Sequence, residues 1–361
     1  MNPAPTTQSA AESTPATEPI LQVKGLCKYF PIKSKGFFKK QIGTVKASDN
    51  ITFDLMPGET LGLVGESGCG KTTTGRSILR ALAPTKGEVI FRLNGETVDL
   101  AQLSEKEIKP LRTKMQMIFQ DPFSSLNPRM TVGDIVGEPL VIHKIGNKAD
   151  RTEKVMEMLR KVGLKPEHRT RYPHAFSGGQ RQRIGIARAL IMNPDLVVCD
   201  EAVSALDVSV QAQVINLLQD LQKELGLTYI FIAHDLSVVK HICDRIAVMY
   251  AGKTVELATT KQLFDKPMHP YTKALLSAVP NPDPDQPMNM NLAGEVADPG
   301  NLPPGCAFNP RCEACIDPCD KQVPGLIEMP DGRFLACHLH SDSDHERKIR
   351  DQELTEGAGS V

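Results

Sequence analysis

A glycine-rich run near residue 65 has the residue types and spacing of a phosphate-binding loop. The run Gly65-Glu66-Ser67-Gly68-Cys69-Gly70-Lys71-Thr72, continued by Thr73, follows a strand-like segment and opens a helix-like one. Its glycines let successive backbone N–H groups turn toward phosphate oxygens, and the helix adds its positive dipole end. Lys71 can reach the β- and γ-phosphates, and the Thr72 hydroxyl can bind Mg²⁺. The run therefore predicts a nucleoside-triphosphate site.

Two carboxylates follow a second apolar run. Leu196–Cys199 reads as a buried strand, and Asp200 and Glu201 come directly after it. The carboxyl edge of a parallel sheet is where such proteins bind ligands. Asp200 is expected to hold Mg²⁺, which prefers oxygen ligands, and Glu201 to polarise an attacking water. Two acids after a strand are weak evidence alone, but the phosphate-binding loop on the same chain strengthens this interpretation.

A second helix is expected to begin at Ser177-Gly178-Gly179-Gln180, with an N-terminus that suits a phosphate. Ser177 is a good N-cap, and the apolar residues after it are spaced for a helix that ends before Pro194. Such a terminus presents N–H groups and a hydroxyl to an anion. Taken in isolation, a capped surface helix with a flexible entry explains the same residues.

The elements that must position these groups alternate between strand and helix, as in an α/β domain. A helix is expected over Val208–Leu225, because its apolar residues recur at helical spacing. Prolines crowd the chain after Leu263, which makes a regular core element there unexpected. The strands expected to matter are Thr60–Val64, Lys114–Phe119, Leu196–Cys199, Thr228–Ala233 and Arg245–Met249.

The same texture divides the chain into four parts. Residues 1–19 and 341–361 are expected to be a disordered and a mobile tail. Residues 20–263 form the α/β domain, and residues 264–340 form an extension.

Composition excludes several classes of protein. The 361 residues carry a formal net charge of −1, which offers no electrostatic grip on nucleic acid. No apolar stretch approaches the roughly 18 to 20 residues of a membrane span, and the N-terminus lacks the features of a secretory signal. The chain is therefore expected to stay inside the cell, with any membrane role supplied by partners.

The order of these motifs resembles that of the ABC ATPase family over roughly residues 20–260. The resemblance implies a P-loop α/β fold with a RecA-like core, an antiparallel β subdomain and a helical subdomain. It implies that ATP and Mg²⁺ bind between two ATPase subunits, with Ser177–Gln180 acting on the partner's nucleotide. The resemblance also implies roles for single residues. Gln120 would contact Mg²⁺ and the water, and His234 would hold the γ-phosphate and orient that water. Asp207 would lie at the dimer seam, and Phe30, or failing that Tyr29, would stack on adenine.

Two further stretches narrow the resemblance. Asp121–Met130 and His269–Leu276 are similar to ATPase subunits of oligopeptide/dipeptide ABC importers. That subfamily implies a sister ATPase, two membrane permeases and an external substrate-binding protein, with the ATPase at the cytoplasmic face of the inner membrane. The segment after Gln120 would form part of the groove for a permease helix. Peptides are the expected cargo, and nickel, glutathione or another small solute is the alternative.

Five of the nine cysteines crowd into the extension. Cys306, Cys312, Cys319 and Cys337 resemble the C-terminal region of the same subfamily, which favours a [4Fe–4S] cluster. Cys315 has no assigned role. Its C-x₂-C spacing from Cys312 is that of one half of a zinc site, which is the alternative interpretation. Ordinary reduced cysteines are the third interpretation.

Two other functions compete with the importer motor. A soluble ABC ATPase acting on DNA or ribosomes would use the same dimer chemistry, but the charge balance disfavours it. A regulatory subunit without turnover is disfavoured because Glu201 and His234 are both present.

Overall fold

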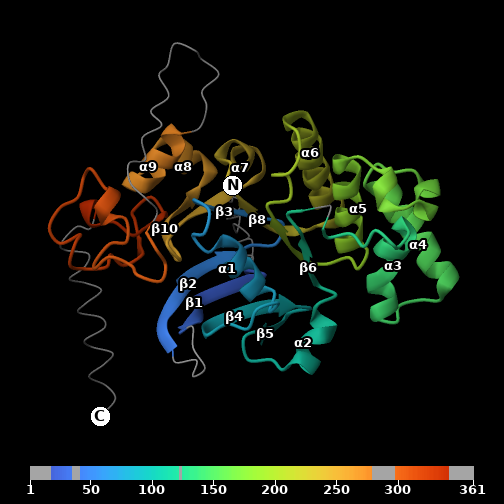
Figure 1. Cartoon of the computed structure of the whole chain (residues 1–361), viewed down its shortest axis with the longest axis horizontal. Helices are drawn as coiled ribbons and strands as arrows, with labels where there is room; N and C mark the ends of the chain where they lie inside the picture. Colours follow the sequence, from blue (N-terminus) through green and yellow to red (C-terminus); the bar gives the residue numbers. More distant parts are fainter. Residues whose placement is uncertain (1–17, 35–40, 122–123, 279–296, 341–361) are drawn as a thin grey trace, which may run out of the picture.

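The computed structural model describes residues 18–34, 41–121, 124–278 and 297–340. The expected N-terminal tail lies outside these residues except for Glu18 and Pro19, and the expected C-terminal tail lies outside them completely. Two sheets organise the rest (Figure 1). One has eight strands in the order β11-β12-β10-β9-β3-β8-β7-β6, and the other has four in the order β2-β1-β4-β5.

The centre of the larger sheet is parallel and buried. Its β3 pairs in parallel with both β8 and β9, and β7 lies between β8 and β6. All residues of β3, β7 and β8 are buried, as expected for strands covered on both faces. The five strands predicted from the sequence are confirmed within a residue or two at their ends: β3 (Thr60–Val64), β6 (Met115–Ile118), β7 (Leu196–Asp200), β8 (Thr228–Ala233) and β9 (Arg245–Tyr250).

The expectation of no regular core element after Leu263 is wrong. Helix α8 (Thr260–Asp265) spans that boundary, and β10 (Lys253–Thr259) pairs with β12 (Phe334–Leu335), which pairs with β11 (Ile327–Glu328). Helix α9 (Pro270–Ser277) places its proline in the first turn, where the missing N–H costs no helical hydrogen bond. The extension therefore continues the main sheet.

The smaller sheet is the antiparallel subdomain. It consists of β1 (Leu21–Lys33), β2 (Gln41–Leu55), β4 (Lys86–Leu93) and β5 (Glu96–Asp99). Its apolar face shares one core cluster with β3 and with α1 (Lys71–Ile78). The short helix α2 (Glu105–Leu111) follows β5.

A helical subdomain lies at the opposite end of the molecule from the extension (Figure 1). It contains α3 (Val132–Ile142), α4 (Lys148–Lys161) and α5 (Gly178–Leu190), with the 3₁₀ turns Pro166–Thr170 and Pro173–Ala175 between α4 and α5. Ser177 caps α5 as predicted, and α6 occupies the predicted Val208–Leu225. Helix α7 (Leu236–Ile242) follows β8.

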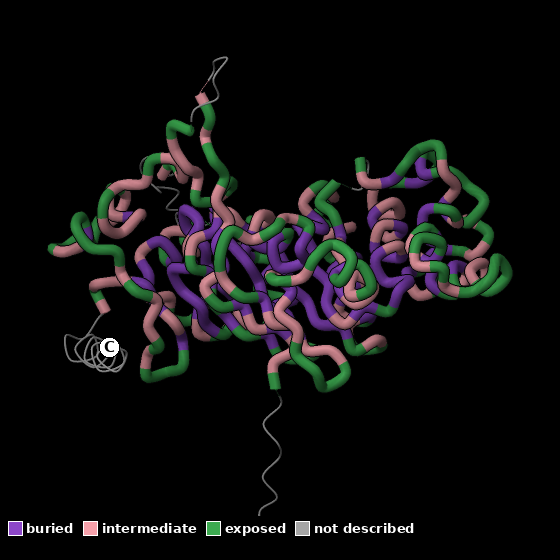
Figure 2. Tube along the Cα trace, turned by 90° about the horizontal axis from the view of Figure 1, so that it is seen from below, coloured by how far each residue is buried: buried purple, intermediate pink, exposed green. Residues whose placement is uncertain are grey.

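Buried positions run through the middle of the molecule, with exposed loops around them (Figure 2). Within the described residues, no helix combines the length and the apolar character that crossing a membrane requires. The architecture is the predicted one: a parallel α/β core, an antiparallel subdomain, a helical subdomain and an extension that bears cysteines.

Candidate active site

Glycine is required at both ends of the loop between β3 and α1. Gly65 has φ +148°, and a Cβ there would lie 2.2 Å from the Met249 carbonyl oxygen. Gly70 has φ +104°, and a Cβ there would lie 1.8 Å from the Ala47 carbonyl oxygen. The loop therefore closes directly onto the backbones of β9 and β2, which only glycine permits.

The lysine of the loop is folded into it. Lys71 is 5% exposed, and its Nζ donates hydrogen bonds to the carbonyl oxygens of Gly65 (2.7 Å) and Glu66 (3.0 Å). Beneath it, burial raises the pKa of the Cys69 thiol, so this cysteine stays neutral and packs as a small apolar residue. The loop thus concentrates positive charge and backbone N–H groups beside the start of α1.

Two oxygen ligands suited to Mg²⁺, one from Thr72 and one from Asp200, lie close together at the carboxyl end of β7. The Thr72 hydroxyl donates to Asp200 Oδ1 at 2.7 Å, and Arg76 lies 3.6 Å from the same carboxylate. Asp200 is 1% exposed, and burial raises the pKa of its carboxyl group. A buried carboxylate of this kind is stabilised in its charged form by a nearby cation, so Thr72 and Asp200 fit Mg²⁺.

The three predicted catalytic side chains converge. Glu201 Oε2 accepts a hydrogen bond from Gln120 Nε2 at 2.7 Å and lies 3.2 Å from His234 Nδ1. They follow β7, β6 and β8, neighbouring parallel strands whose carboxyl ends meet at one edge. Glu201 has φ +47°, a strained conformation for a non-glycine residue, and its N–H donates to the Ile232 carbonyl oxygen at 3.0 Å. The turn after β7 therefore aims this carboxylate toward the loop.

The loop and the three converging side chains surround one cavity of about 490 Å³. Ala47 of β2 closes one side of this cavity. The sequence did not single it out, because a methyl side chain has no polar or reactive group. Its lining is Ala47, Ser67, Gly68, Gly70, Lys71, Thr72, Thr73, Gln120, Glu201 and His234. Cationic, hydroxyl, carboxylate and imidazole groups in one such space suit a triphosphate, Mg²⁺ and a water.

The aromatic residue predicted for adenine is not among the lining residues. Phe30 is 38% exposed on β1, with Lys28 Nζ 5.1 Å from its ring centroid. The Tyr29 hydroxyl donates to Asp49 Oδ1 at 2.5 Å, which engages its polar end. Stacking of Phe30 on adenine therefore stays a prediction.

The serine–glycine turn and Asp207 also lie away from this cavity. Ser177 is exposed, and its hydroxyl accepts from the Gln180 N–H at 3.4 Å in a capping box. Gly179 lets the start of α5 approach α6, because a Cβ there would lie 2.4 Å from Val210 Cγ1. Asp207 is exposed at the N-cap of α6. Within one chain these residues do not complete the phosphate site.

Four of the late cysteines face one small cavity of about 10 Å³. Its lining includes Cys306, Cys312, Cys319 and Cys337, the four expected to share a cluster, and omits Cys315. Burial raises the pKa of the Cys306 thiol, and it raises that of Cys337 to about 11. No three His, Cys, Asp or Glu side chains in the described part of the chain are arranged as ligands for a metal ion. The donor chemistry thus suits a thiophilic metal, but the ligand geometry does not by itself support one.

Sequence reasoning missed a contact between the extension and the phosphate-binding loop. Arg311 forms an ion pair with Glu66, and the Tyr271 hydroxyl accepts a hydrogen bond from the Glu66 N–H at 2.9 Å. Arg311 and Glu66 are separated by 245 positions, and no local pattern signals such a pairing.

Known proteins share both the core and the extension. The family model "ABC transporter" matches residues 48–204, and "Oligopeptide/dipeptide transporter, C-terminal region" matches residues 255–319. The oligopeptide transport ATP-binding protein AppF of Bacillus subtilis (strain 168) is 52% identical over 328 residues, covering 90% of this chain and 98% of that protein. The chain belongs to the ATP-binding subunits of the oligopeptide/dipeptide ABC transporter family.

Solved structures of ABC transporter ATPases agree with this family in fold. The cbiO1 subunit of Clostridium perfringens, part of the complex cbiONQ, superposes with a TM-score of 0.58 at 26% identity, covering 69% of this chain and 92% of cbiO1. A dimeric post-hydrolysis state of the ATP-binding cassette MJ0796, bound to ADP and Pi, gives 0.57 at 27% identity, covering 66% and 98%.

As an ABC transporter ATPase, the chain must stabilise the negative charge that develops around the γ-phosphoryl group during hydrolysis. Lys71 and several residues of the loop line the cavity, and their ammonium and backbone N–H groups would neutralise that charge. Mg²⁺, held by Thr72 and Asp200, would supply further positive charge.

Proposed function

We propose that this ATPase powers the uptake of di- and oligopeptides at the cytoplasmic face of the inner membrane. It would pair with a sister ATPase and two membrane permeases, supplied by an external substrate-binding protein. The match of residues 255–319 to the oligopeptide/dipeptide C-terminal region and the similarity to AppF support this assignment.

One observation carries the proposal that the motor works as a pair. The cavity of Lys71 and Glu201 is lined by nothing from Ser177–Gln180, and Ser177, which caps that helix, is exposed elsewhere on the chain. A helix N-terminus with a serine hydroxyl suits a phosphate. Each chain would therefore supply the phosphate-binding loop of one composite site and the serine–glycine turn of the other. The sister's turn would close the γ-phosphate held by this chain, and this chain's turn would close the sister's.

Within the closed site, the residues of this chain have separate roles. Glu201 would accept a proton from the attacking water. His234, whose Nδ1 lies 3.2 Å from Glu201 Oε2, would hold the γ-phosphate and orient that water. Gln120 bonds the same carboxylate and begins the segment that leads to the helical subdomain. Because Gln120 contacts Glu201 and also begins the segment toward the helical subdomain, a movement of that subdomain would alter the position of the Glu201 carboxylate.

A groove of about 710 Å³ in the helical subdomain is the proposed seat of the permease helix. Its wall combines Arg129 and Met130 with residues of α3 and α4, among them Val141 and Val155. Val141 is 56% exposed, and the same lining includes basic and acidic side chains such as Arg129 and Glu138. An amphipathic helix fits such a groove through its apolar face.

The transport proposal is tested on the complex reconstituted in lipid vesicles with its permeases, sister ATPase and binding protein. We expect di- or oligopeptides to stimulate ATP hydrolysis severalfold and to accumulate inside the vesicles. A complex carrying Lys71→Ala is the control and should show neither effect. Stimulation by Ni²⁺ or glutathione but by no peptide would overturn the assignment of cargo.

We further propose that Cys306, Cys312, Cys319 and Cys337 hold a [4Fe–4S] cluster. All four line one small cavity, and four cysteine thiolates are the usual ligands of such a cluster, which supports the proposal. In anaerobically purified chain, Cys312→Ser should reduce bound iron and visible absorbance, whereas Cys315→Ser, outside the cavity, should change neither. Colourless, iron-free wild-type protein, or protein that holds zinc instead, would contradict the proposal.

A further inference from the structure

Every polar group of Glu66 in the phosphate-binding loop has a partner. Its carbonyl oxygen accepts from Lys71 Nζ at 3.0 Å, and its N–H donates to the Tyr271 hydroxyl at 2.9 Å. Its carboxylate accepts two hydrogen bonds from Arg311, Nη1 to Oε2 at 2.8 Å and Nη2 to Oε1 at 3.1 Å. Two of these three partners come from the C-terminal part of the chain.

The Arg311 guanidinium is buried and held in place. Its side chain is 5% exposed, and its Cζ lies 5.9 Å from the ring centroid of Tyr250 and 5.8 Å from that of Phe308. The bonds to Glu66 raise the pKa of Arg311 above its already high usual value. A bidentate arginine–carboxylate pair fixes direction as well as distance, which a lysine cannot do.

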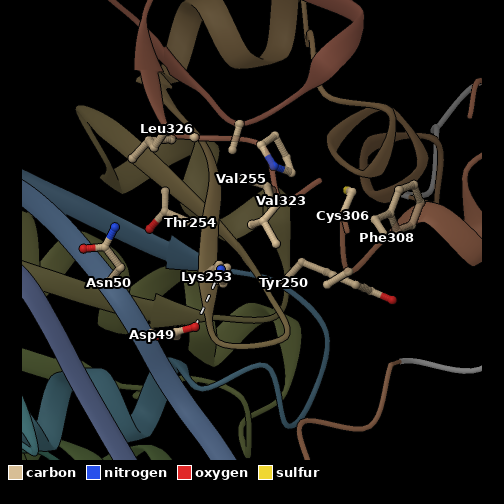
Figure 3. Close-up of a pocket in the computed structure, with 14 residues that line it drawn as sticks. Asp49, Asn50, Tyr250, Lys253, Thr254, Val255, Cys306, Phe308, Val323 and Leu326 are labelled. Atoms are coloured by element: carbon tan, nitrogen blue, oxygen red, sulfur yellow. Dashed lines mark ion pairs between the residues drawn. The ribbon is translucent and has the colours of Figure 1, made fainter. Parts of the chain in front are cut away.

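The surrounding aromatic residues join the extension to the core. Tyr250 packs edge-on against both Tyr271 (4.7 Å between centroids) and Phe308 (5.3 Å). Figure 3 shows the neighbouring cavity of about 220 Å³, whose wall combines core residues such as Lys253 with Phe308 and Leu326 of the extension. The platform beneath Arg311 is therefore assembled from both parts of the chain.

We propose that Arg311 is a positioning residue for ATP, which holds the phosphate-binding loop in its binding conformation through Glu66. Arg311 does not line the phosphate cavity, so it acts through the loop and not on the nucleotide. Because the loop is ordered before ATP arrives, binding costs less conformational entropy. Loss of the pair should weaken MgATP binding more than it slows turnover at saturating MgATP.

The test measures MgATP affinity of the full chain by equilibrium titration, and KM and kcat of the assembled complex. We expect Arg311→Gln to raise the Kd for MgATP about tenfold while kcat changes by less than about twofold. Arg311→Lys should restore part of the affinity, because one charged hydrogen bond to Glu66 remains. Glu66→Gln, on the partly exposed side of the pair, provides a second route if the Arg311 variants fold poorly.

A matched control comes from the other buried arginine of the extension. Arg333 is 2% exposed and pairs with Glu256 of β10 at 3.1 Å, so it ties the same extension to the core without touching the loop. Arg333→Lys should lower the Tm while leaving the Kd for MgATP within about twofold of wild type. The double variant Glu66→Gln/Arg311→Gln should bind no more weakly than the weaker single variant, because both changes remove one interaction.

An unchanged Kd in both Arg311→Gln and Glu66→Gln overturns the proposal. So does an equal rise in Kd for Arg333→Lys, which would mean that any loosening of the extension weakens binding. The inference rests on the ATPase function, which the same titration checks separately. Wild-type chain must bind MgATP, and Lys71→Ala must lose that binding.

Discussion

Single residues in the phosphate-binding loop differ sharply in what they tolerate. Gly70 and Gly68 both have positive φ, +104° and +80°, but their surroundings are opposite. A Cβ at Gly70 would meet the Ala47 carbonyl oxygen, whereas a Cβ at Gly68 would meet nothing within 4 Å. The same motif therefore contains glycines needed for close approach, Gly65 and Gly70, and one, Gly68, needed for backbone conformation alone.

We expect Gly70→Ala to destabilise the chain more than Gly68→Ala does. The Gly68 variant should lose only the conformational cost, on the order of 1 to 3 kcal/mol. The Gly70 variant must also displace β2 and should lose about 2 kcal/mol more, together with MgATP binding. Urea unfolding of both variants measures the difference, and equal losses would show that the contact with Ala47 is unimportant.

A second residue-scale prediction concerns the carboxylate after β7. Glu201→Gln keeps the size of the side chain but removes its ability to accept a proton from water. We expect MgATP affinity within about threefold of wild type and a loss of hydrolysis of about 100-fold or more. Glu153→Gln, an exposed position on α4, should leave both unchanged. Near-normal turnover of the Glu201 variant would remove this residue from its role.

At the scale of elements, helix α9 begins with a buried histidine. His269 is 1% exposed, and its Nδ1 accepts a hydrogen bond from the Tyr271 N–H at 3.0 Å. Burial lowers the pKa of His269 to about 4. Because the unfolded chain takes up this proton near its ordinary pKa, the stabilisation is complete above that value and is lost as the pH falls toward 4.

We expect this one group to remove about 2 kcal/mol of stability between about pH 7 and about pH 5. His269→Asn retains a good N-cap but does not titrate, so its free energy of unfolding should depend less on pH over that range. Urea unfolding of both proteins at each pH tests this. Equal pH dependence of wild type and variant would contradict the neutral buried imidazole.

Sequence predicted the elements of the core well because their signals are local. Strands β3 and β8 carry no charged residue and only one threonine each, at the first position, and the apolar spacing in α6 predicted the bounds of its helix to the residue. Strands β11 and β12 were missed because two-residue strands carry no periodicity. Each forms only through long-range pairing, β12 with β10 and β11 with β12. The prolines after Leu263 predicted no regular element there, but one of them, Pro270, starts α9.

The candidate site was predictable to the same extent. Lys71, Glu201 and His234 sit in recognisable motifs at the ends of strands, and the fold brings them together. The pairing of Arg311 with Glu66 depends on the path of the extension, which no motif encodes. Ala47 contributes through its backbone and has no sequence signature.

At the scale of the whole molecule, two helix N-termini that suit a phosphate lie apart on the same chain. One belongs to the loop before α1, and the other is the exposed Ser177 cap of α5. Two such chains, arranged head to tail, would bring each start to the other's nucleotide. Hydrolysis would then depend on closure of the pair, and closure would deliver force to the permeases through the helical subdomains.

The most direct test is a structure of the assembled complex with MgATP, made with Glu201→Gln to prevent hydrolysis. We expect the γ-phosphate beside Lys71 to be contacted by the serine–glycine turn of the sister subunit, while Ser177 of this chain contacts the other nucleotide. A nucleotide fully enclosed by this chain alone, with Ser177 facing solvent, would contradict it.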